Sequence, residues 1–401
     1  MDNTSYTLIA PSTAVTTELA NNTPEIIPGP DERYPHHQFL GIFLPYALLI
    51  DRLVTPIWYI IGAIGNTLSA KVWLEKRIRS SNSSAIYLAT LAISDLLFLM
   101  LHILVDLKYA WGFHPLKYPV LCEVFFVLYL VPQYLSPLLV LGFTIERYIA
   151  VCHPFKKERY CTPQTAQKAI ICLVVSSVLL CVVQAWFWTY SDGACVIRAK
   201  AIEGQNASIW SVWTWSTEII IFMLVPLTIL LFNILVIQEI KRLRRMDLIY
   251  HQEHHKAWAA TTVMLLSVSF YVIFTTLPAT LVYSMTYVLP ERTTNLTDAQ
   301  IRTDSSWQGY FSYLMIRKIV EEICLSHYAC NIFIYLVTGI QFRTALANNI
   351  RCVMNSLKGI KHVNNYNQVP GRNDNVKKQK TMTSIDIAST QPHNEFEVTK
   401  V

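Results

Sequence analysis

The sequence predicts an all-α membrane protein whose core is a bundle of seven transmembrane helices. Of its 401 residues, 53% are hydrophobic and 15% are charged, proportions typical of membrane proteins rather than soluble domains. A helix that crosses a bilayer needs ~20 mostly apolar residues in succession. Seven stretches reach or approach that length: residues 48–74, 84–107, 120–145, 167–190, 209–237, 257–289 and 311–338.

Lys and Arg are unevenly distributed among the connections between these stretches. Most follow the first, third and fifth stretches, as Lys76, Arg77, Arg79, Lys156, Lys157, Arg159, Lys241, Arg242, Arg244 and Arg245. Because positive charge is retained on the cytoplasmic side, the N-terminus is predicted outside and the C-terminus inside. The first stretch then serves as the membrane signal, and the basic inner segments fit an anionic leaflet better than nucleic acid.

Acceptor tripeptides for N-glycosylation agree with this orientation. Asn-X-Ser/Thr occurs on the predicted outer side at Asn3, Asn21, Asn206 and Asn295, and on the inner side at Asn82. We expect the four outer sites to be modified and Asn82 to stay bare.

One charge lies near the middle of a predicted helix. Asp95 sits within an otherwise uncharged stretch, and a mid-membrane carboxylate costs a few kcal/mol (~2.5–3.5 on insertion scales). Its side chain is too short to reach the interface, so it must find partners inside the bundle. Asn66, Ser136 and Asn331 lie at comparable depth. A helix–helix hydrogen-bond cluster without regulatory role is the alternative.

The tripeptide Glu-Arg-Tyr occurs three times in the chain. Residues 146–148 end an apolar helix at the inner face, where the adjacent charges can pair in one packing and separate in another. Residues 158–160 fall in a basic segment that we expect to be a solvated loop, and residues 32–34 in a disordered tail.

Short motifs occur in order, one for each of several predicted helices. They are Gly65-Asn66, Leu91-Ala92-Ile93-Ser94-Asp95, Glu146-Arg147-Tyr148, Pro226, Leu277-Pro278 and Asn331-Ile332-Phe333-Ile334-Tyr335. In this set the chain resembles the rhodopsin-like (class A) G-protein-coupled receptors from about residue 48 to 352. The segment after the third helix looks most like invertebrate neuropeptide receptors of the FMRFamide, myosuppressin and proctolin type.

The resemblance implies roles for several of these residues. Glu146, Arg147, Tyr148 and Tyr335 would form the switch that faces a heterotrimeric G protein, and Asp95, Ser136 and Asn331 an allosteric sodium and water site. Pro226 and Pro278 would bend the fifth and sixth helices. Cys122 and Cys195, both predicted outside, would form a disulfide. A short amphipathic eighth helix over 341–353 would end near Cys352, a palmitoylation site.

Two departures from the family pattern bear on activation. Ile332 stands where family members carry a proline, so we expect a straighter seventh helix, and Thr276 stands where the sixth helix usually carries tryptophan. The usual tryptophan-switch account of activation is therefore in doubt for this chain.

The outer halves of the predicted helices indicate the ligand class. Tyr129 occupies the position at which amine receptors carry an aspartate, which argues against an amine ligand. Lys318 lies too near the outer end to hold retinal, which argues against an opsin. The predicted pocket is polar and aromatic: Asp106, Tyr109, Tyr129, Gln133, Glu218, Tyr283, Arg317, Lys318, Glu321 and Glu322.

Two interpretations of the pocket charges remain open. Asp106, Glu218 and one of Glu321 and Glu322 can converge on a basic group of a ligand. Alternatively, the charges of the seventh helix satisfy one another at i, i+4 spacing, Arg317 with Glu321 and Lys318 with Glu322. Glu218 has no such local partner and is the strongest candidate for a ligand contact.

The chain is thus predicted to be a plasma-membrane receptor for an extracellular peptide, with a receptor for a small non-peptide ligand as the alternative. We expect no enzyme activity and no metal centre, and a transporter would show an internal repeat that is not visible. Residues 1–45 are predicted to be a disordered outer tail, 46–340 the receptor domain and 354–401 a disordered inner tail. Thr381, Thr383, Ser384, Ser389 and Thr390 are candidate sites for a receptor kinase and arrestin, and Thr399-Lys400-Val401 for a PDZ protein.

Overall fold

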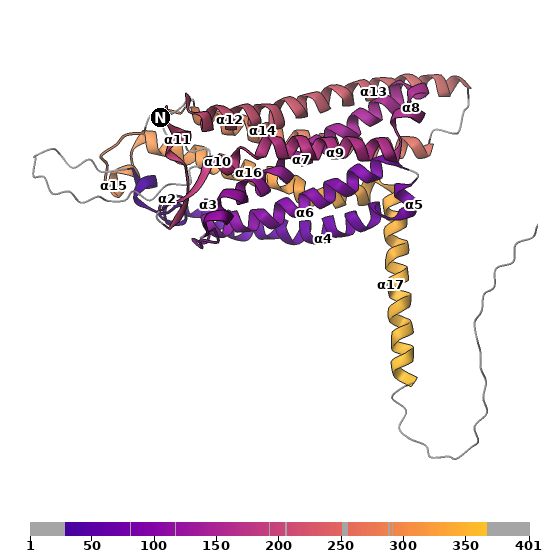
Figure 1. Cartoon of the computed structure of the whole chain (residues 1–401), viewed down its shortest axis with the longest axis horizontal. Coiled ribbons are helices and arrows are strands. Elements are labelled where there is room, and N and C mark those ends of the chain that lie inside the picture. Colours follow the sequence, from indigo (N-terminus) through magenta and orange to yellow (C-terminus); the bar gives the residue numbers. More distant parts are fainter. Residues whose placement is uncertain are drawn as a thin grey trace, which may run out of the picture. The chain divides into compact units, whose positions relative to one another are not determined.

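The protein is a bundle of long helices, as the computed structural model shows (Figure 1). The structure describes residues 29–80, 82–116, 118–191, 193–204, 207–250, 256–287, 289–290 and 292–366. Within them, seven helical segments are long and apolar enough to cross a membrane, and each overlaps one of the predicted stretches. The predicted fold class is therefore confirmed.

The seven segments are built from ten helices. In chain order these are α3 (Pro45–Leu53) with α4 (Thr55–Trp73), α6 (Ser83–Tyr109), α7 (Pro119–Cys152), α9 (Pro163–Cys181) with α10 (Gln184–Phe187), α12 (Ile209–Glu218) with α13 (Val225–Tyr250), α14 (Lys256–Ser284) and α16 (Ser305–Thr338). The six-residue π-helix η2 (Ile219–Leu224) joins α12 to α13.

Short elements gather at the two ends of the bundle. One end, at the left in Figure 1, carries α2 (His36–Phe43), α11 (Ala199–Ile202) and α15 (Asp298–Ile301), with α1 (Pro30–Arg33) and the 3-10 turn η4 (Met285–Tyr287). The other end carries α5 (Lys76–Arg79) and α8 (Pro154–Tyr160). Following the predicted orientation, we call the first end outer and the second inner.

A two-stranded hairpin covers part of the outer end. Strands β1 (Trp188–Ser191) and β2 (Ala194–Ile197) pair antiparallel, with Tyr190 opposite Cys195. Residues 188–190, predicted to end the fourth span, therefore belong to this hairpin. A disulfide joins Cys195 to Cys122 at the start of α7, with a Cα–Cα distance of 5.6 Å, so the predicted disulfide is confirmed.

Proline shapes the fifth helix through the hydrogen bond that it cannot make. Pro226 has no N–H for the carbonyl of Phe222, four residues earlier, and the π-helix lies directly before it. The Thr280 hydroxyl of α14 donates to that carbonyl at 2.9 Å. The two helices are thus hydrogen-bonded at this irregularity. By contrast, α16 runs unbroken through Ile332 to Thr338.

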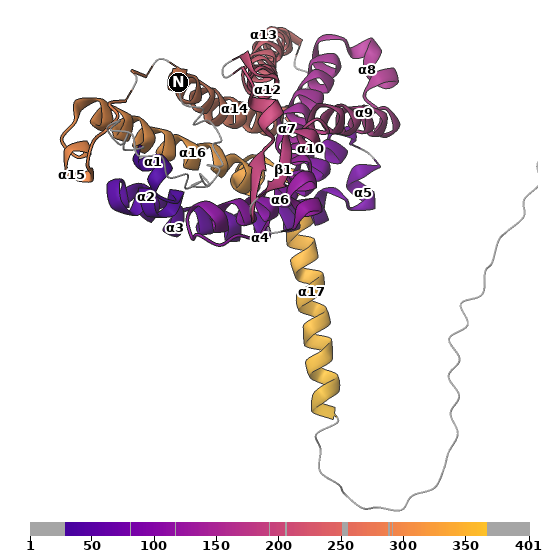
Figure 2. The same ribbon diagram turned by 60° about the vertical axis from the view of Figure 1, so that its left-hand side comes forward.

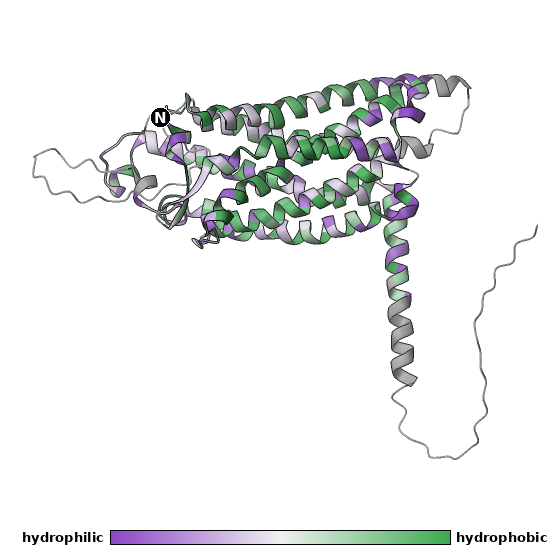
Figure 3. Ribbon diagram, viewed as in Figure 1, coloured by the Kyte–Doolittle hydropathy of each residue, from purple (hydrophilic) through white to green (hydrophobic). Residues whose placement is uncertain are grey.

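Small residues let the first and seventh helices approach closely. A Cβ atom on Gly65 would lie 2.8 Å from the Ile332 side chain. At the inner end, the fully buried ring of Tyr335 packs on Trp73 and Phe342, with centroids 5.6 and 5.3 Å apart. The helices of the bundle are rich in hydrophobic residues (Figure 3), and many large apolar side chains on them are exposed, where lipid rather than water would meet them.

The amino-terminal segment differs from the prediction. Residues 1–45 are predicted to be disordered, yet 30–33 and 36–43 form α1 and α2, and Phe39 and Leu40 are buried. Packing against the rest of the outer end supplies the stability that such short helices lack alone. Residues 1–28, with Asn3 and Asn21, lie outside the described residues, as does Asn206.

The helix after α16 also differs from the prediction. α17 (Ile340–Tyr366) begins at the expected place but continues beyond residue 353 into the tail predicted to be disordered. Residues 1–349 form one compact unit and residues 350–401 a second, which contains the exposed Cys352. The candidate kinase sites and Thr399-Lys400-Val401 lie outside the described residues.

Candidate functional site

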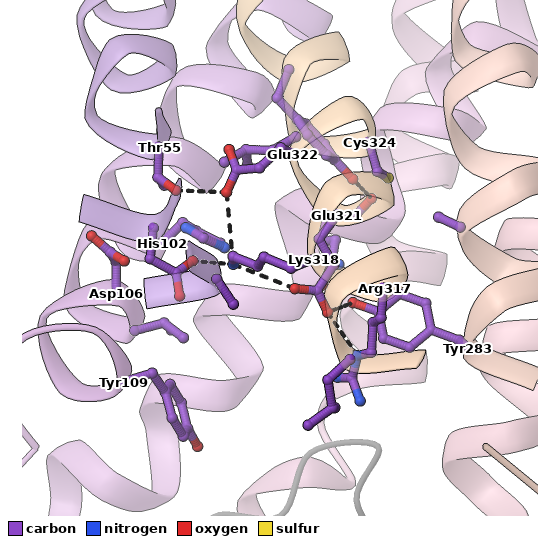
Figure 4. Close-up of a pocket in the computed structure, with 18 of the residues that line it drawn as sticks. Thr55, His102, Asp106, Tyr109, Tyr283, Arg317, Lys318, Glu321, Glu322 and Cys324 are labelled. Carbon is purple, nitrogen blue, oxygen red and sulfur yellow. Dashed lines mark hydrogen bonds and ion pairs between the residues drawn. The ribbon is translucent and has the colours of Figure 1, made fainter. Parts of the chain in front are cut away.

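A cavity of about 290 Å³ opens between the outer halves of the helices. Six predicted ligand-binding residues line it: Asp106, Tyr129, Gln133, Glu218, Tyr283 and Glu321. Tyr109, Arg317, Lys318 and Glu322 line it as well, so the structure brings the whole predicted set together. Figure 2 shows the outer end of the bundle turned toward the viewer, and Figure 4 shows the cavity lining.

Lys318 is the centre of an ion-pair cluster on one side of the cavity (Figure 4). Its ammonium group contacts the Asp51 carboxylate of α3 and lies 3.4 Å from Glu321 and 3.6 Å from Glu322. One cation therefore serves three carboxylates. Buried carboxylates require such partners because removing charge from water is expensive.

Arg317, the residue before Lys318 on α16, completes the cluster. Its Nε lies 2.8 Å from Oε1 of Glu321, and its guanidinium lies 4.6 Å from the centre of the Tyr283 ring. The Tyr283 hydroxyl donates to the same oxygen of Glu321 at 2.6 Å. The charges of the seventh helix therefore pair with one another, as the second interpretation of the pocket charges predicted. Glu321 nevertheless lines the cavity.

The first span contributes partners that the sequence interpretation missed. Thr55 donates its hydroxyl to Glu322 at 2.7 Å, and the Trp58 indole donates to the same carboxylate at 3.1 Å. Asp51, which contacts Lys318, is 7% exposed. The sequence does contain a signal for Asp51, because it is a charged residue at the outer end of the first predicted helix.

Two further acids of the cavity are placed differently. Among the described residues, no Lys or Arg lies within ion-pair distance of Asp106 on α6 or Glu218 on α12. Aromatic rings also line the cavity: the Phe98 ring lies 4.1 Å from that of Tyr328 and 5.4 Å from that of Tyr129. Each of the two acids can accept a positive group of a ligand.

The predicted mid-membrane site is assembled around Asp95, which is fully buried. The Ser136 hydroxyl donates to its Oδ1 at 2.7 Å, and the Asn331 amide donates to its Oδ2 at 2.9 Å. Asn66 instead donates to the Tyr328 carbonyl at 2.8 Å. Two of the three predicted partners therefore meet Asp95 directly.

A second polar cluster forms at the inner end around Glu146, which is 6% exposed. The hydroxyls of Ser83 and Ser84, at the start of α6, donate to its Oε1 at 2.5 and 3.0 Å. Arg147 lies 4.0 Å from the same oxygen and donates to Ser84 and, at 3.4 Å, to Asn82. Hydroxyl groups thus carry most of the contact between the two charges.

The other predicted switch residues lie apart from this cluster. The Tyr148 ring packs against Phe232 of α13 and His153, with centroids 5.1 and 5.5 Å away. Tyr335 is buried against Trp73, as described above, and its hydroxyl has no partner among the described residues.

The three Glu-Arg-Tyr copies have three different settings. In the first copy, Glu146 and Arg147 belong to the inner cluster. Residues 158–160 form the exposed end of α8, a short helix rather than the predicted loop. Arg33 and Tyr34, expected in a disordered tail, both contact Asp298 of the third outer connection.

Comparison with known families identifies the architecture. Residues 65–340 match the family described as "7 transmembrane receptor (rhodopsin family)". The chain belongs to the rhodopsin family of seven-transmembrane receptors. It is therefore a multi-pass membrane protein of a family of receptors rather than enzymes, as the sequence predicted.

Some known receptors match about a third of this chain, and others match most of it at lower identity. A match to human neurotensin receptor type 1 is 33% identical over 137 residues, 32% of this chain and 33% of that receptor, so the chain matches about a third of its length. The match to the FMRFamide receptor of Drosophila melanogaster is 24% identical and covers 74% of this chain and 60% of that receptor. Human C-C chemokine receptor type 8 is 23% identical over 72% of this chain and 75% of its own length.

Proposed function

We propose that this protein is a plasma-membrane receptor that binds an extracellular peptide and activates a heterotrimeric G protein. One observation carries the proposal: a charged cavity at the outer end, a buried carboxylate site in the middle and a buried arginine cluster at the inner end occupy one helix bundle. Binding at the first can thus bias the packing at the last.

The charges of the cavity favour a ligand with a basic group. Lys318 and Arg317 pair with Asp51, Glu321 and Glu322, whereas Asp106 and Glu218 line the cavity without a Lys or Arg partner among the described residues. A ligand guanidinium or ammonium would supply the missing charge and make charge-assisted hydrogen bonds. We expect Glu218 to hold that group, with Gln133 and Tyr129 beside it.

Similarity to receptors for peptides supports a peptide rather than a small non-peptide ligand. The relatives include receptors named for neurotensin, pyrokinin, FMRFamide and neuromedin-U. A small non-peptide ligand is the competing outcome of the experiment below.

A sodium ion fits the site around Asp95. Small hard cations prefer oxygen ligands, and the site offers the Asp95 carboxylate and the Ser136 hydroxyl. Oδ1 of Asn331 is buried there without a partner among the described residues. When bound, the ion would offset the buried negative charge.

At the inner end, Arg147 is the residue that we expect to face the G protein. With its present contacts to Ser84 and Glu146, the Arg147 side chain is 11% exposed, so binding a partner would require these contacts to open. Glycosylation at Asn3, Asn21, Asn206 and Asn295, palmitoylation at Cys352, and kinase, arrestin and PDZ partners remain proposals of the same kind.

The test is expression in cells with a promiscuous G protein, with calcium as the readout and a neuropeptide library as the ligand source. We expect an active peptide, and loss of its potency with Glu218→Gln. Glu123→Gln is the matched control, because Glu123 lies one residue after Cys122 on α7 and does not line the cavity. Activity that survives complete proteolysis of an active tissue extract would contradict a peptide ligand.

Unchanged potency in Glu218→Gln would contradict the pocket assignment while leaving the receptor function intact. If small amines activated the receptor and no peptide of the library did, the result would favour the non-peptide alternative.

A further inference from the structure

The amino-terminal segment Pro30–Leu44 lies over the outer cavity. His36, Phe39 and Leu40 of α2 line the cavity together with residues of the bundle, and Phe39 and Leu40 are 3% and 5% exposed. A segment that the sequence assigns to a tail thus supplies part of the cavity wall. We call residues 30–44 the roof.

Apolar contacts fix the roof to the outward extension of α16. The ring of Phe43 stacks on Phe311 with centroids 5.5 Å apart, and Phe39 lies 6.3 Å from the same ring. Phe39 and Phe311 share one buried cluster with Trp307 of α16 and Ile301 of the third outer connection, and Phe43 packs against it. The roof therefore has a core with the bundle, and this core explains why its short helices form.

Polar contacts tie both ends of the roof to the third outer connection. Arg33 pairs with Asp298 at 2.9 Å, and the Tyr34 hydroxyl donates to the other carboxylate oxygen at 2.6 Å. At the far end, Arg302 donates to the Ile42 carbonyl at 2.8 Å. Asp298 begins α15, which has a capping box from Thr297 and Gln300.

We propose that the roof is part of the ligand site, that Phe39 and Leu40 contact the bound ligand, and that Arg33, Tyr34 and Asp298 form a latch that controls entry to the cavity. A ligand that reaches Glu218 from outside must pass the roof. Its outer part then packs against apolar side chains and its inner part meets the acids.

The ion pair of the latch is weak enough to open and close. The side chains of Arg33 and Asp298 are 23% and 36% exposed, and ion pairs of this exposure contribute little and are screened by salt. The latch can therefore open at small cost. The aromatic contacts of Phe39, which is buried, and of Phe43 with Phe311 are stronger and keep the roof near the cavity when the latch is open.

Cys324 provides a probe that needs neither a ligand nor a G protein. This free cysteine lines the cavity, whereas Cys152 and Cys161 lie at the inner end. In intact cells, a membrane-impermeant trimethylammonium methanethiosulfonate reagent reaches Cys324 through the outer opening. The measurement is the rate of Cys324 modification, followed by mass spectrometry of the purified receptor.

We expect Arg33→Ala and Asp298→Asn each to raise this rate about threefold or more, which corresponds to loss of one weak ion pair. Tyr34→Phe should raise it less, and Phe39→Ala should raise it most. Lys200→Ala is the matched control, because it removes a positive charge from the exposed face of α11 away from the latch. Cys324→Ser should abolish the signal.

The double variant Arg33→Ala/Asp298→Asn separates a latch from a general charge effect. If the two side chains act through one pair, the double variant matches the faster single variant. Rates within about twofold of wild type in both single variants, at equal surface expression, would overturn the proposal. So would a Lys200→Ala rate as fast as theirs. Neither result would bear on ligand class or G-protein coupling.

Discussion

The outer and inner ends of the bundle both bury carboxylates, but they satisfy them with different chemistry. At the outer end, Lys318 and Arg317 hold Glu321 and its neighbours through ion pairs. At the inner end, hydroxyls of Ser83 and Ser84 carry most of the contacts of Glu146. A buried ion pair is costly to break because one charge remains without compensation, whereas hydroxyl hydrogen bonds exchange at lower cost. The outer cluster is therefore a fixed platform, and the inner one can rearrange.

Removing the central cation should break the outer platform and give the largest effect. Lys318→Met leaves three carboxylates with one cation fewer, and breaking such a buried pair typically costs ~3–5 kcal/mol. We expect a large drop in surface expression and in the thermal unfolding midpoint of the purified protein. Lys318→Arg keeps the charge and should recover most of both.

A melting temperature of Lys318→Met close to that of wild type would remove the distinction between the two ends. Recovery in Lys318→Arg would show that the charge is needed rather than the shape of the side chain.

The inner cluster offers a matched pair of smaller changes. Ser84 contacts both Glu146 and Arg147, whereas Ser83 contacts Glu146. Hydrogen bonds to charged groups contribute ~1.5–3 kcal/mol each. Ser84→Ala should therefore free Arg147 and raise ligand-independent G-protein activation, and Ser83→Ala should raise it less. Basal signalling and melting temperature measured on both variants give the comparison.

Equal basal signalling in Ser83→Ala and Ser84→Ala would show that Arg147 is not held through Ser84. A change in melting temperature without any change in basal signalling would make the cluster structural.

The sequence predicts those parts of the molecule in which a single residue carries a strong physical constraint. Length and apolarity define the seven spans, and the cost of a mid-membrane charge identifies Asp95 together with partners at the same depth. The six predicted cavity residues meet because each lies in the outer half of its helix. Depth in the membrane is thus readable from the sequence.

The rotation of a helix about its axis and its contacts with distant segments are harder to predict from the sequence. Ser83 and Ser84 reach Glu146 because of how α6 is rotated, and hydroxyl residues in helices give no pattern that predicts this. The roof helices span four and eight residues, too short to form from local propensity, and they depend on contacts with Asp298 and Phe311 far along the chain. Residues 188–190, which pair with 195–197 in the hairpin, were predicted to end the fourth span.

Asp95 lies between the two ends in position and in chemistry, since its carboxyl group is fully buried and its donors, Ser136 and Asn331, are neutral. Asp95→Asn keeps a side chain that can accept from Ser136, so we expect a change in melting temperature near zero without sodium. In wild type, sodium should raise the melting temperature because it binds the folded state, and the substitution should abolish this dependence. Choline chloride at equal ionic strength is the control for screening. If sodium stabilises both proteins equally, the ion acts elsewhere and Asp95 belongs with the hydrogen-bonded carboxylates of the inner end. If only wild type responds, Asp95 is a carboxylate whose cation comes from solution, whereas the outer cluster carries its cations on α16.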